Sequence, residues 1–507
     1  RIGEECRSRN IAVILGPSAN MKRSPLCGRN FEYFSEDPYL GAHIAAAYVK
    51  GVQSKDVSAC VKHFTANNQE YRRQTCSSEA DERTLREIYL NAFEDVVKEG
   101  KPDIMMASYN KVNGTYMTEN KKILTDILRD EWGFDGYVMS DWSAVSDRVK
   151  ALKAGLDLAM PGEGLYMDQE IVKAVQDGMI TEEELDKAVE RILKIIFKFT
   201  DSDKKGTFDK EYDHNISKKV AEESMVLLKN DGILPLPEKG KKIAFIGAFA
   251  KTPRFQGGGS SNVNPYKVIS ALDAAKSITE ISYAQGFELT GEKRNDELFD
   301  AALKTAAEAD VVVIFAGLPE TFESEGFDRT HMRMPECQNE LISEIAKVQK
   351  NVVVVLHNGA PVEMPWTDEV KGILEAYLGG EAVGQAVVEL LFGRKNPCGK
   401  LAETIPYKLE DTPSYLYFPG NGKKVEYREG VFVGYRYYDT KKMQVRFPFG
   451  HGLSYTRFEY SNLQVSKENM TDNETLQVSF KVKNVGNMAG KEIVQLYVSD
   501  KTHLAER

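Results

Sequence analysis

Long apolar runs and basic blocks are both missing from this chain of 507 residues. Its longest apolar stretches, at 310–319 and 351–362, are strand-sized, whereas a membrane-spanning helix needs about 20 consecutive apolar residues. The 66 lysines and arginines are outnumbered by 76 aspartates and glutamates, which gives a net charge of −10. A nucleic-acid groove depends on clustered positive charge. The sequence therefore predicts neither a membrane span nor a nucleic-acid partner.

Cysteine is scarce as well, with six residues in the chain. They form no CxxC pair and show no Cys/His spacing typical of zinc ligands, which argues against a disulfide scaffold and against a structural metal. Free thiols favour a reducing compartment and no signal peptide is visible, so a cytoplasmic location is favoured. Because the chain starts at Arg1, we expect the true N-terminus to be absent, which leaves export open. No residue cluster predicts a cofactor.

Residues 1–205 alternate short apolar runs with amphipathic helices. Strand-like runs occupy four segments, at 11–15, 58–64, 103–109 and 136–140. A helical pattern covers 82–100, and Thr181 with Glu184 forms a capping box that opens another amphipathic helix. Alternation of this kind predicts parallel strands, here an α/β unit of the (β/α)8-barrel type. The strands are too few for eight, so we expect the barrel to be N-terminally incomplete.

A polar stretch at 200–215 predicts a linker to a second α/β unit over 206–400. A helix predicted over 217–231 is followed there by buried strands, which indicates an open parallel sheet covered by helices. The Gly/Ser-rich segment at 256–261 lacks the spacing of a phosphate-binding loop and is interpreted as a flexible connection.

The C-terminal part changes character twice. Residues 401–455 are rich in Tyr, Pro and Gly and predict a loop-rich connector. Residues 456–507 alternate polar and apolar side chains without a helical pattern, which predicts about three strands of an incomplete antiparallel sandwich.

Chemically capable side chains lie at or directly after the carboxyl ends of the predicted strands of the first unit: Lys62, His63, Tyr109, Asp141 and Trp142, with Arg29 and Arg73 on neighbouring loops. In a (β/α)8 barrel the carboxyl ends of the strands form the active-site face. Cations around one carboxylate keep it ionised. An ionised Asp141 beside Trp142 then suits attack at the anomeric carbon of a sugar, although an Asp in this position also serves to cap a helix.

Several longer motifs carry a resemblance to a known family. In chain order they are LGPSANMKRSPLCGRNFEYFSEDPYL, KHFTANNQEYRR, DERTLREIYLNAFE, MASYNKVNG, ILTDILRDEWGFDGYVMSDW, AGLDLAMPG, ESEGFDRTHMRMP and FPFGHGLSYT. Together they resemble glycoside hydrolase family 3 β-glucosidases over essentially the whole chain. The resemblance implies a (β/α)8-type barrel, an α/β sandwich and a fibronectin type III-like domain, in that order, and a carbohydrate substrate.

The same resemblance implies roles for individual residues. The nucleophile of the family matches Asp141 in the SDW motif, and the acid/base matches Glu325 in EGFDR, with Glu323 as the competing acid two residues earlier. The sugar-binding residues of the family match Arg29, Lys62, His63, Arg73 and Tyr109, and Trp142 matches the aromatic residue that flanks the −1 and +1 subsites.

Two departures from the family pattern accompany these matches. An Asp from an SDGPHG-like motif has no counterpart, and Asn20 stands where many members carry Asp.

The segment KHFTANNQE argues against the N-acetylglucosaminidase branch. We therefore expect retaining release of terminal β-D-glucose. A β-xylosidase, a broad β-glycosidase and an inactive sugar-binding scaffold are the alternatives, and the oligomeric state stays open.

Overall fold

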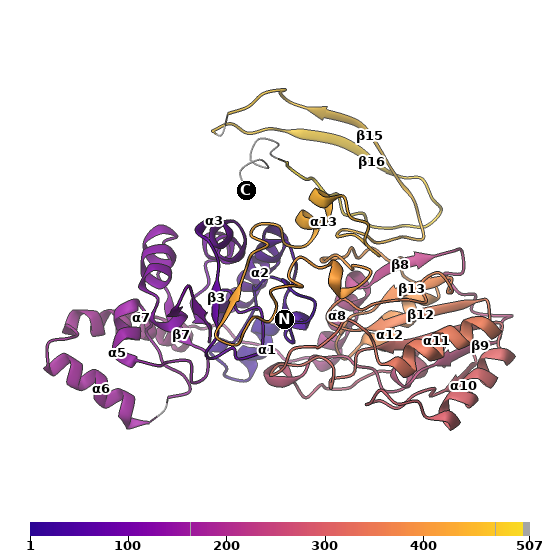
Figure 1. Ribbon diagram of the computed structural model, residues 1–507, viewed down its shortest axis with the longest axis horizontal. Coiled ribbons are helices and arrows are strands. Elements are labelled where there is room, and N and C mark those ends of the chain that lie inside the picture. The colour runs from indigo at the N-terminus through magenta and orange to yellow at the C-terminus, as the bar shows by residue number, and fades with distance from the viewer. Residues whose placement is uncertain (163, 472, 500–507) are drawn as a thin grey trace.

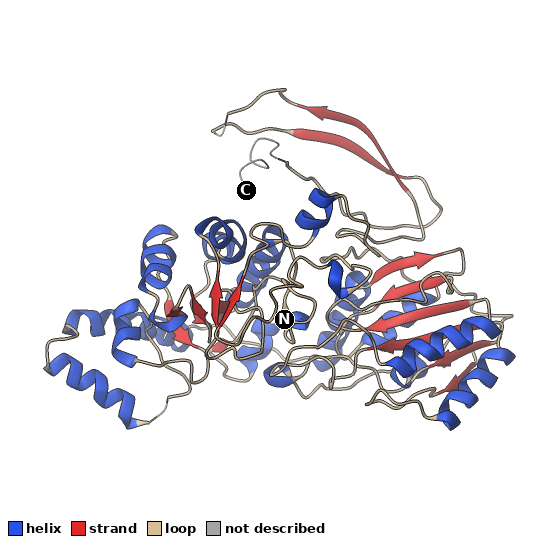
Figure 2. Ribbon diagram, in the orientation of Figure 1, coloured by secondary structure: helices blue, strands red, loops and turns tan. Residues whose placement is uncertain are grey.

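The computed structural model of the protein describes residues 1–162, 164–471 and 473–499. Two units of mixed helices and strands lie side by side, and a long two-stranded ribbon extends above them (Figure 1). Sheets and helices are mixed in both units (Figure 2), so the chain has an α/β fold, as its sequence predicts. Within the described residues no helix is both long enough and apolar enough to cross a membrane.

The first unit is built on a parallel sheet with the strand order β1-β2-β4-β7. Its strands are β1 (Val13–Ile14), β2 (Ser58–Phe64), β4 (Ile104–Ala107) and β7 (Tyr137–Ser140), which confirms all four runs expected from the sequence. β4 and β7 are buried along their whole length, which is typical of parallel strands covered on both faces.

Helices surround this sheet. They are α1 (Ile2–Ser8), α2 (Pro38–Gln53), α5 (Arg148–Ala154), α6 (Leu165–Gln176) and α7 (Glu182–Thr200), together with η5 (Lys122–Glu131) and the continuous turns α3 (Glu82–Thr84), η2 (Leu85–Tyr89), α4 (Asn91–Asp95) and η3 (Val96–Gly100). Short 3-10 turns are η1 (Asn30–Glu32) and η4 (Met117–Glu119). The capping box predicted at Thr181 is present at the start of α7. The side chain of Asp37 caps α2 in the same way, through the N–H of Leu40.

The second unit contains a six-stranded sheet with the order β10-β9-β11-β12-β13-β8. Its strands are β8 (Val226–Asn230), β9 (Ile243–Ile246), β10 (Ile281–Ala284), β11 (Val311–Gly317), β12 (Val352–His357) and β13 (Gly372–Glu375). Its helices are α8 (Lys210–Ser224), α9 (Ala271–Ala275), α10 (Asp296–Glu308), α11 (Glu336–Val348) and α12 (Val383–Leu391), with the turns η6 (Ala248–Ala250) and η7 (Gly259–Ser261). Figure 2 shows helices beside this sheet, as the sequence predicts.

One predicted helix of this unit is partly wrong. The helix expected over 217–231 ends at Ser224, and residues 226–230 form β8, which pairs antiparallel with β13. The buried run Val226–Leu228 explains the error, because a short apolar segment fits a helix and an interior strand equally well.

The segment 401–455 contains more structure than a connector. It includes η8 (Leu409–Asp411), β14 (Lys424–Glu426) and α13 (Tyr435–Lys441). β14 joins a small sheet of the first unit with β3 (Ser77–Glu79), β5 (Lys111–Val112) and β6 (Thr115–Tyr116). The segment therefore returns from the second unit and packs onto the first.

The C-terminal ribbon consists of β15 (Phe458–Val465) and β16 (Val478–Asn484), paired antiparallel. The last of the about three strands predicted for 456–507 corresponds to the alternating run at 491–500. The prediction is wrong for 491–499, which belong to no strand, and residue 500 lies outside the described residues. Leu496 and Val498 are exposed there. Their segment joins no sheet, so their apolar side chains have no buried sheet face on which to lie.

Candidate active site

The carboxyl ends of the parallel strands in the first unit bring predicted site residues together. Lys62 and His63 lie in the last part of β2, Tyr109 follows β4 by two residues, and Asp141 follows β7 directly. The guanidinium of Arg73 stacks on the ring of Tyr109 at 4.5 Å, and His63 Nε2 lies 3.8 Å from Asp141 Oδ2. Residues far apart in the sequence therefore converge at one sheet edge.

Asp141 is held with one oxygen bound and one oxygen free. Its backbone N–H donates to Ala107, and its Oδ1 accepts the N–H of Trp142 at 2.8 Å. Oδ2 has no hydrogen-bond partner among the described residues, and the side chain is almost fully buried. The expectation that cations lower the pKa of Asp141 is wrong in its net direction. Burial raises this pKa, and it outweighs the Trp142 N–H, the charge of Arg29 and the Tyr109 side chain, which act in the opposite direction. A buried carboxylate with a free oxygen is suited to attack an electrophilic carbon.

His63 is fixed by Asn20, a position that the sequence marks only as a departure from the family. Asn20 Oδ1 accepts the backbone N–H of His63 at 2.7 Å, and Asn20 Nδ2 donates to the carbonyl of His63 at 2.9 Å. Burial, followed by the charges of Arg29 and Lys62, holds the pKa of His63 well below its usual range. His63 is therefore neutral at pH 7 and is available as a hydrogen-bonding group.

Glu325 reaches this cluster from the second unit. Its Oε1 lies 2.9 Å from Arg73 Nη1 and 3.4 Å from Arg29 Nη1. Its Oε2 accepts the backbone N–H of Ser260 at 2.8 Å and also the Ser260 hydroxyl. Burial alone would raise the pKa of Glu325, but Arg29, Ser260 and Arg73 together lower it to about 2. The carboxylate of Glu325 is therefore an anion at pH 7.

Glu323, the competing acid, points into the interior of the second unit. Its side chain is fully buried and forms an ion pair of 2.7 Å with Arg254, and it also accepts the N–H of Gly359. Of the two acids, Glu325 is the one in contact with Arg29 and Arg73. The geometry therefore favours Glu325 over Glu323 as the acid at the strand ends.

The remaining predicted residues complete the cluster. Arg29 is buried and bonds Glu32 as well as Glu325, and Lys62 Nζ lies 4.0 Å from Glu32 Oε2. Trp142 is 37% exposed, so its ring is open to a ligand arriving from solvent. No group of three His, Cys, Asp or Glu side chains suited to a metal ion occurs among the described residues.

The sequence missed three residues that hold this arrangement in place. Ser260 binds Glu325 from the Gly/Ser segment, and Glu70 accepts Arg73 Nη1 at 2.7 Å and the N–H of Gly326 at 2.8 Å. Asp328 accepts three backbone N–H groups of the first unit. The EGFDR motif could have drawn attention to Asp328, but nothing local identifies its partners.

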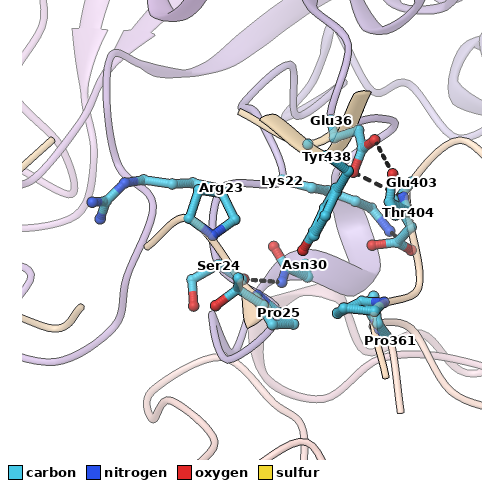
Figure 3. A pocket seen from close by; sticks show the side chains of 14 residues that line it. Lys22, Arg23, Ser24, Pro25, Asn30, Glu36, Pro361, Glu403, Thr404 and Tyr438 are labelled. Atoms are coloured by element: carbon cyan, nitrogen blue, oxygen red, sulfur yellow. Dashed lines mark hydrogen bonds and ion pairs between the residues drawn. The ribbon is translucent and has the colours of Figure 1, made fainter. Parts of the chain in front are cut away.

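A cavity of about 30 Å³, room for about two water molecules, lies at the meeting of both units and the segment 401–455 (Figure 3). Its lining includes Lys22, Asn30, Glu36, Glu403 and Tyr438, and Lys22 Nζ pairs with Glu403 at 2.6 Å. None of the eight predicted site residues lines this cavity. It is therefore distinct from the cluster around Asp141 and Glu325.

Comparison with protein families places both units of the chain. The glycosyl hydrolase family 3 N-terminal domain matches residues 1–195, and the glycosyl hydrolase family 3 C-terminal domain matches residues 225–455. Thermostable β-glucosidase B of Acetivibrio thermocellus is 56% identical over 505 residues, which cover 98% of this chain and 67% of that protein. An exo-α-(1→6)-L-arabinopyranosidase of Bifidobacterium longum is 47% identical over 510 residues, with the same two coverages.

Solved structures give the same result. The crystal structure of a GH3 β-glucosidase from Bifidobacterium adolescentis is 47% identical and superposes with a TM-score of 0.91 over 96% of this chain and 71% of its own. β-Glucosidase 3B of Thermotoga neapolitana in complex with α-D-glucose is 38% identical, with a TM-score of 0.88 over 96% and 73% of the two chains. The chain therefore belongs to glycosyl hydrolase family 3.

Proposed function

We propose that the protein is a retaining β-glucosidase that releases terminal, non-reducing β-D-glucose from β-glucosides and cello-oligosaccharides. The observation that carries this proposal is the placement of Glu325, from the second unit, against Arg29 and Arg73 of the strand-end cluster that contains Asp141. The identity of 56% to a thermostable β-glucosidase supports the substrate class.

In the proposed mechanism Asp141 Oδ2 attacks C1 of the glucosyl unit, and the bond from C1 to the departing oxygen breaks. Glu325 protonates that oxygen, and afterwards it takes a proton from the water that releases glucose from Asp141. Arg29, Lys62, His63, Arg73 and Tyr109 bind the sugar hydroxyls, and Trp142 stacks on the ring.

Glu325 must be protonated before it can act as an acid. Substrate binding favours this protonation because it raises the pKa of Glu325. Sugar hydroxyls that engage Arg29 and Arg73 weaken the hold of these cations on the Glu325 carboxylate. The bound sugar also excludes water, which disfavours the charged form. Both effects raise the pKa of Glu325 from about 2 toward the working pH.

We also propose the finer architecture. The sheet of residues 1–205 belongs to a (β/α)8-type barrel, residues 206–400 form an α/β sandwich, and residues 401–455 form a segment that joins this sandwich to residues 456–507, part of a fibronectin type III-like domain. The family assignment and the two α/β units support this division.

A second substrate class follows from the arabinopyranosidase relatives, which are 47% and 46% identical. A pocket discriminates weakly against a xyloside, which lacks only the hydroxymethyl group of a glucoside, whereas an α-L-arabinopyranoside also differs in configuration at C4. The first experiment therefore compares hydrolysis of p-nitrophenyl β-D-glucoside, β-D-xyloside and α-L-arabinopyranoside. We expect the highest kcat/KM with the glucoside. A preference for another glycoside would replace the proposed substrate.

A second experiment tests the mechanism. Proton NMR of a p-nitrophenyl β-D-glucoside digest, in which the only sugar released is the transferred glucosyl unit, will show β-glucose first, because two displacements retain the configuration. Asp141→Ala will lose activity on every glucoside, whereas the control Glu320→Ala removes an exposed acid from the loop of Glu325 and keeps that activity. Initial formation of α-glucose would exclude retention, and an active Asp141→Ala enzyme would exclude the nucleophile.

A further inference from the structure

The loop that carries Glu325 is fastened to the first unit through one buried carboxylate. Asp328 Oδ1 accepts the backbone N–H groups of Gly28 at 3.1 Å and Glu70 at 2.8 Å. Asp328 Oδ2 accepts the backbone N–H of Tyr71 at 2.8 Å. All three donors belong to the first unit, so a single side chain of the second unit binds two separate loops of its neighbour.

Those two loops carry the arginines that contact Glu325. Gly28 immediately precedes Arg29, and Glu70 lies three residues before Arg73. Asp328 itself lies three residues after Glu325. The hydrogen bonds of Asp328 therefore fix the relative position of three groups that meet at one point, with the Glu325 carboxylate between the two guanidinium groups.

In two further hydrogen bonds between these loops, the second unit supplies the donor and the first unit the acceptor. Glu70 Oε2 accepts the N–H of Gly326 at 2.8 Å, and the N–H of Arg329 donates to the carbonyl of Leu26 at 2.8 Å. Each loop thus supplies a side-chain acceptor for the backbone of the other. A reciprocal pattern of this kind leaves little freedom for one loop to slide along the other.

Gly28 shows how closely the two loops approach. A Cβ atom at this position would lie 1.9 Å from the carbonyl oxygen of Phe327 and 2.5 Å from that of Ser324. Both contacts are to backbone and are far shorter than van der Waals distance, so a larger residue would force the loops apart. The docked arrangement requires glycine here.

The bonding of Asp328 is specific for a carboxylate. Burial raises the pKa of Asp328, while the three backbone N–H groups act to keep it ionised. An asparagine has the same shape but replaces one acceptor oxygen with an NH2 group. In either orientation of that amide, its NH2 group faces a backbone N–H. Two donors then meet, and at least one buried hydrogen bond is lost.

We propose that Asp328 is a positioning residue for the reaction. It binds the Glu325 loop to the Arg29 and Arg73 loops, and it thereby holds the proton-donating carboxyl of Glu325 in position relative to Asp141. This inference rests on the proposed acid/base role of Glu325. A merely structural Asp328 would stabilise the fold without affecting proton donation in particular.

The test compares two substrates that differ in their need for an acid. Cellobiose has a poor leaving group and needs protonation, whereas 2,4-dinitrophenyl β-D-glucoside does not. For Asp328→Asn we expect kcat/KM on cellobiose to fall at least about tenfold more than kcat/KM on the dinitrophenyl glucoside. Gly28→Ala pushes the same loops apart without changing any charge, and we expect the same ratio to shift in the same direction.

Glu36→Gln is the matched control. Glu36 is also a buried carboxylate that joins distant segments, because it accepts the backbone N–H and the hydroxyl of Thr404 and the N–H of Tyr435. It lines the cavity of Figure 3 rather than the cluster of Glu325. We expect Glu36→Gln to lower the melting temperature and to leave the ratio between the two substrates unchanged.

The outcomes separate the inference from the proposed function. If Glu325→Ala shows the leaving-group dependence and neither Asp328→Asn nor Gly28→Ala does, Asp328 is not a positioning residue. The same conclusion follows if both variants slow the two substrates equally. If Asp328→Asn does not fold, Gly28→Ala alone decides the matter. If Glu325→Ala itself shows no leaving-group dependence, the proposed acid/base role has failed.

Discussion

Asp141 and Glu325 have the same chemical group in opposite electrostatic surroundings. Burial raises the pKa of Asp141, whereas two arginines and Ser260 lower that of Glu325 to about 2. Environments that separate the pKa values of two carboxyls are typical of paired catalytic acids. The proposed mechanism requires an ionised Asp141 and a protonated Glu325, so substrate binding has to raise the pKa of Glu325.

The lowered pKa of Glu325 predicts a pH dependence of stability. A carboxyl whose folded-state pKa lies below its unfolded value of about 4.5 stabilises the fold above that pH. This contribution is lost as the pH falls from about 4.5 to about 2. We expect wild type to exceed Glu325→Gln in free energy of unfolding at pH 7, with a difference that shrinks below pH 4.5. Urea unfolding at several pH values measures it, and a difference that grows toward low pH would contradict this account.

Lys62 and His63 give a second prediction at the same scale. If their side chains bind sugar hydroxyls, replacement of either with Ala lowers kcat/KM on aryl glucosides by more than about tenfold, or about 1.4 kcal/mol of transition-state binding. Lys50→Ala, at an exposed position of α2, is the control and keeps wild-type kinetics. Unchanged kinetics with a lower melting temperature in Lys62→Ala and His63→Ala would assign both residues a structural role instead.

Residues near the ends of strands were predictable from the sequence pattern, whereas Glu325 came from the family resemblance and its partner Ser260, like Asp328, was not predicted. Asp141, Tyr109 and Lys62 were found because the ends of parallel strands share one edge. Asp328 bonds residues 300, 258 and 257 positions away, and Ser260 lies 65 positions from Glu325. No local pattern encodes such distances.

At the scale of elements, the Gly/Ser segment differs most from its interpretation as a flexible connection. Gly257 and Gly258 are buried, whereas Gly259 is exposed but lies close to Glu325. A Cβ at Gly257 would lie 2.1 Å from the ring of Phe31, and a Cβ at Gly259, where φ is +85°, would lie 2.4 Å from Glu325 Cβ. The segment is therefore closely packed against the candidate active site, although glycines next to serines are typical of open loops.

A pair of glycine substitutions tests this packing. Gly257→Ala places a methyl group against Phe31, so we expect a lower melting temperature and a lower kcat/KM. Gly51→Ala is the control with the opposite expected effect. Gly51 lies in α2, and a Cβ added there would have open space around it. Alanine is favoured over glycine within a helix by about 1 kcal/mol, so the melting temperature rises. A Gly257→Ala enzyme with wild-type stability and activity would show that the segment is loose.

Periodicity predicted most elements, and the errors share one cause. The four strands of the first unit and the capping box of α7 agree with the sequence pattern. The pattern predicts a helix where the structure has the strand β8, and it predicts a strand at 491–499, where none forms. In both places the pattern fixes which side chains are apolar, whereas the partner strand that decides the structure lies elsewhere in the chain.

At the scale of the whole molecule, the candidate site exists only where the two units meet. The first unit supplies Asp141 and the cations, and the second supplies Glu325 and Ser260. Asp328 at the site and Glu36 beside the separate cavity both bridge segments that are hundreds of residues apart. If Asp141 and Glu325 act as proposed, catalysis depends on how the units dock as much as on either sheet.

The most direct test of this account uses Glu325→Ala with 2,4-dinitrophenyl β-D-glucoside. Glycosylation of Asp141 proceeds because the leaving group needs no acid, and hydrolysis stalls because the base is missing. Mass spectrometry is therefore expected to find one glucosyl group on the tryptic peptide 130–148, at Asp141, and azide is expected to remove it as β-glucosyl azide. A label on another residue, or normal turnover with no trapped intermediate, would contradict the account of two carboxylates from two units.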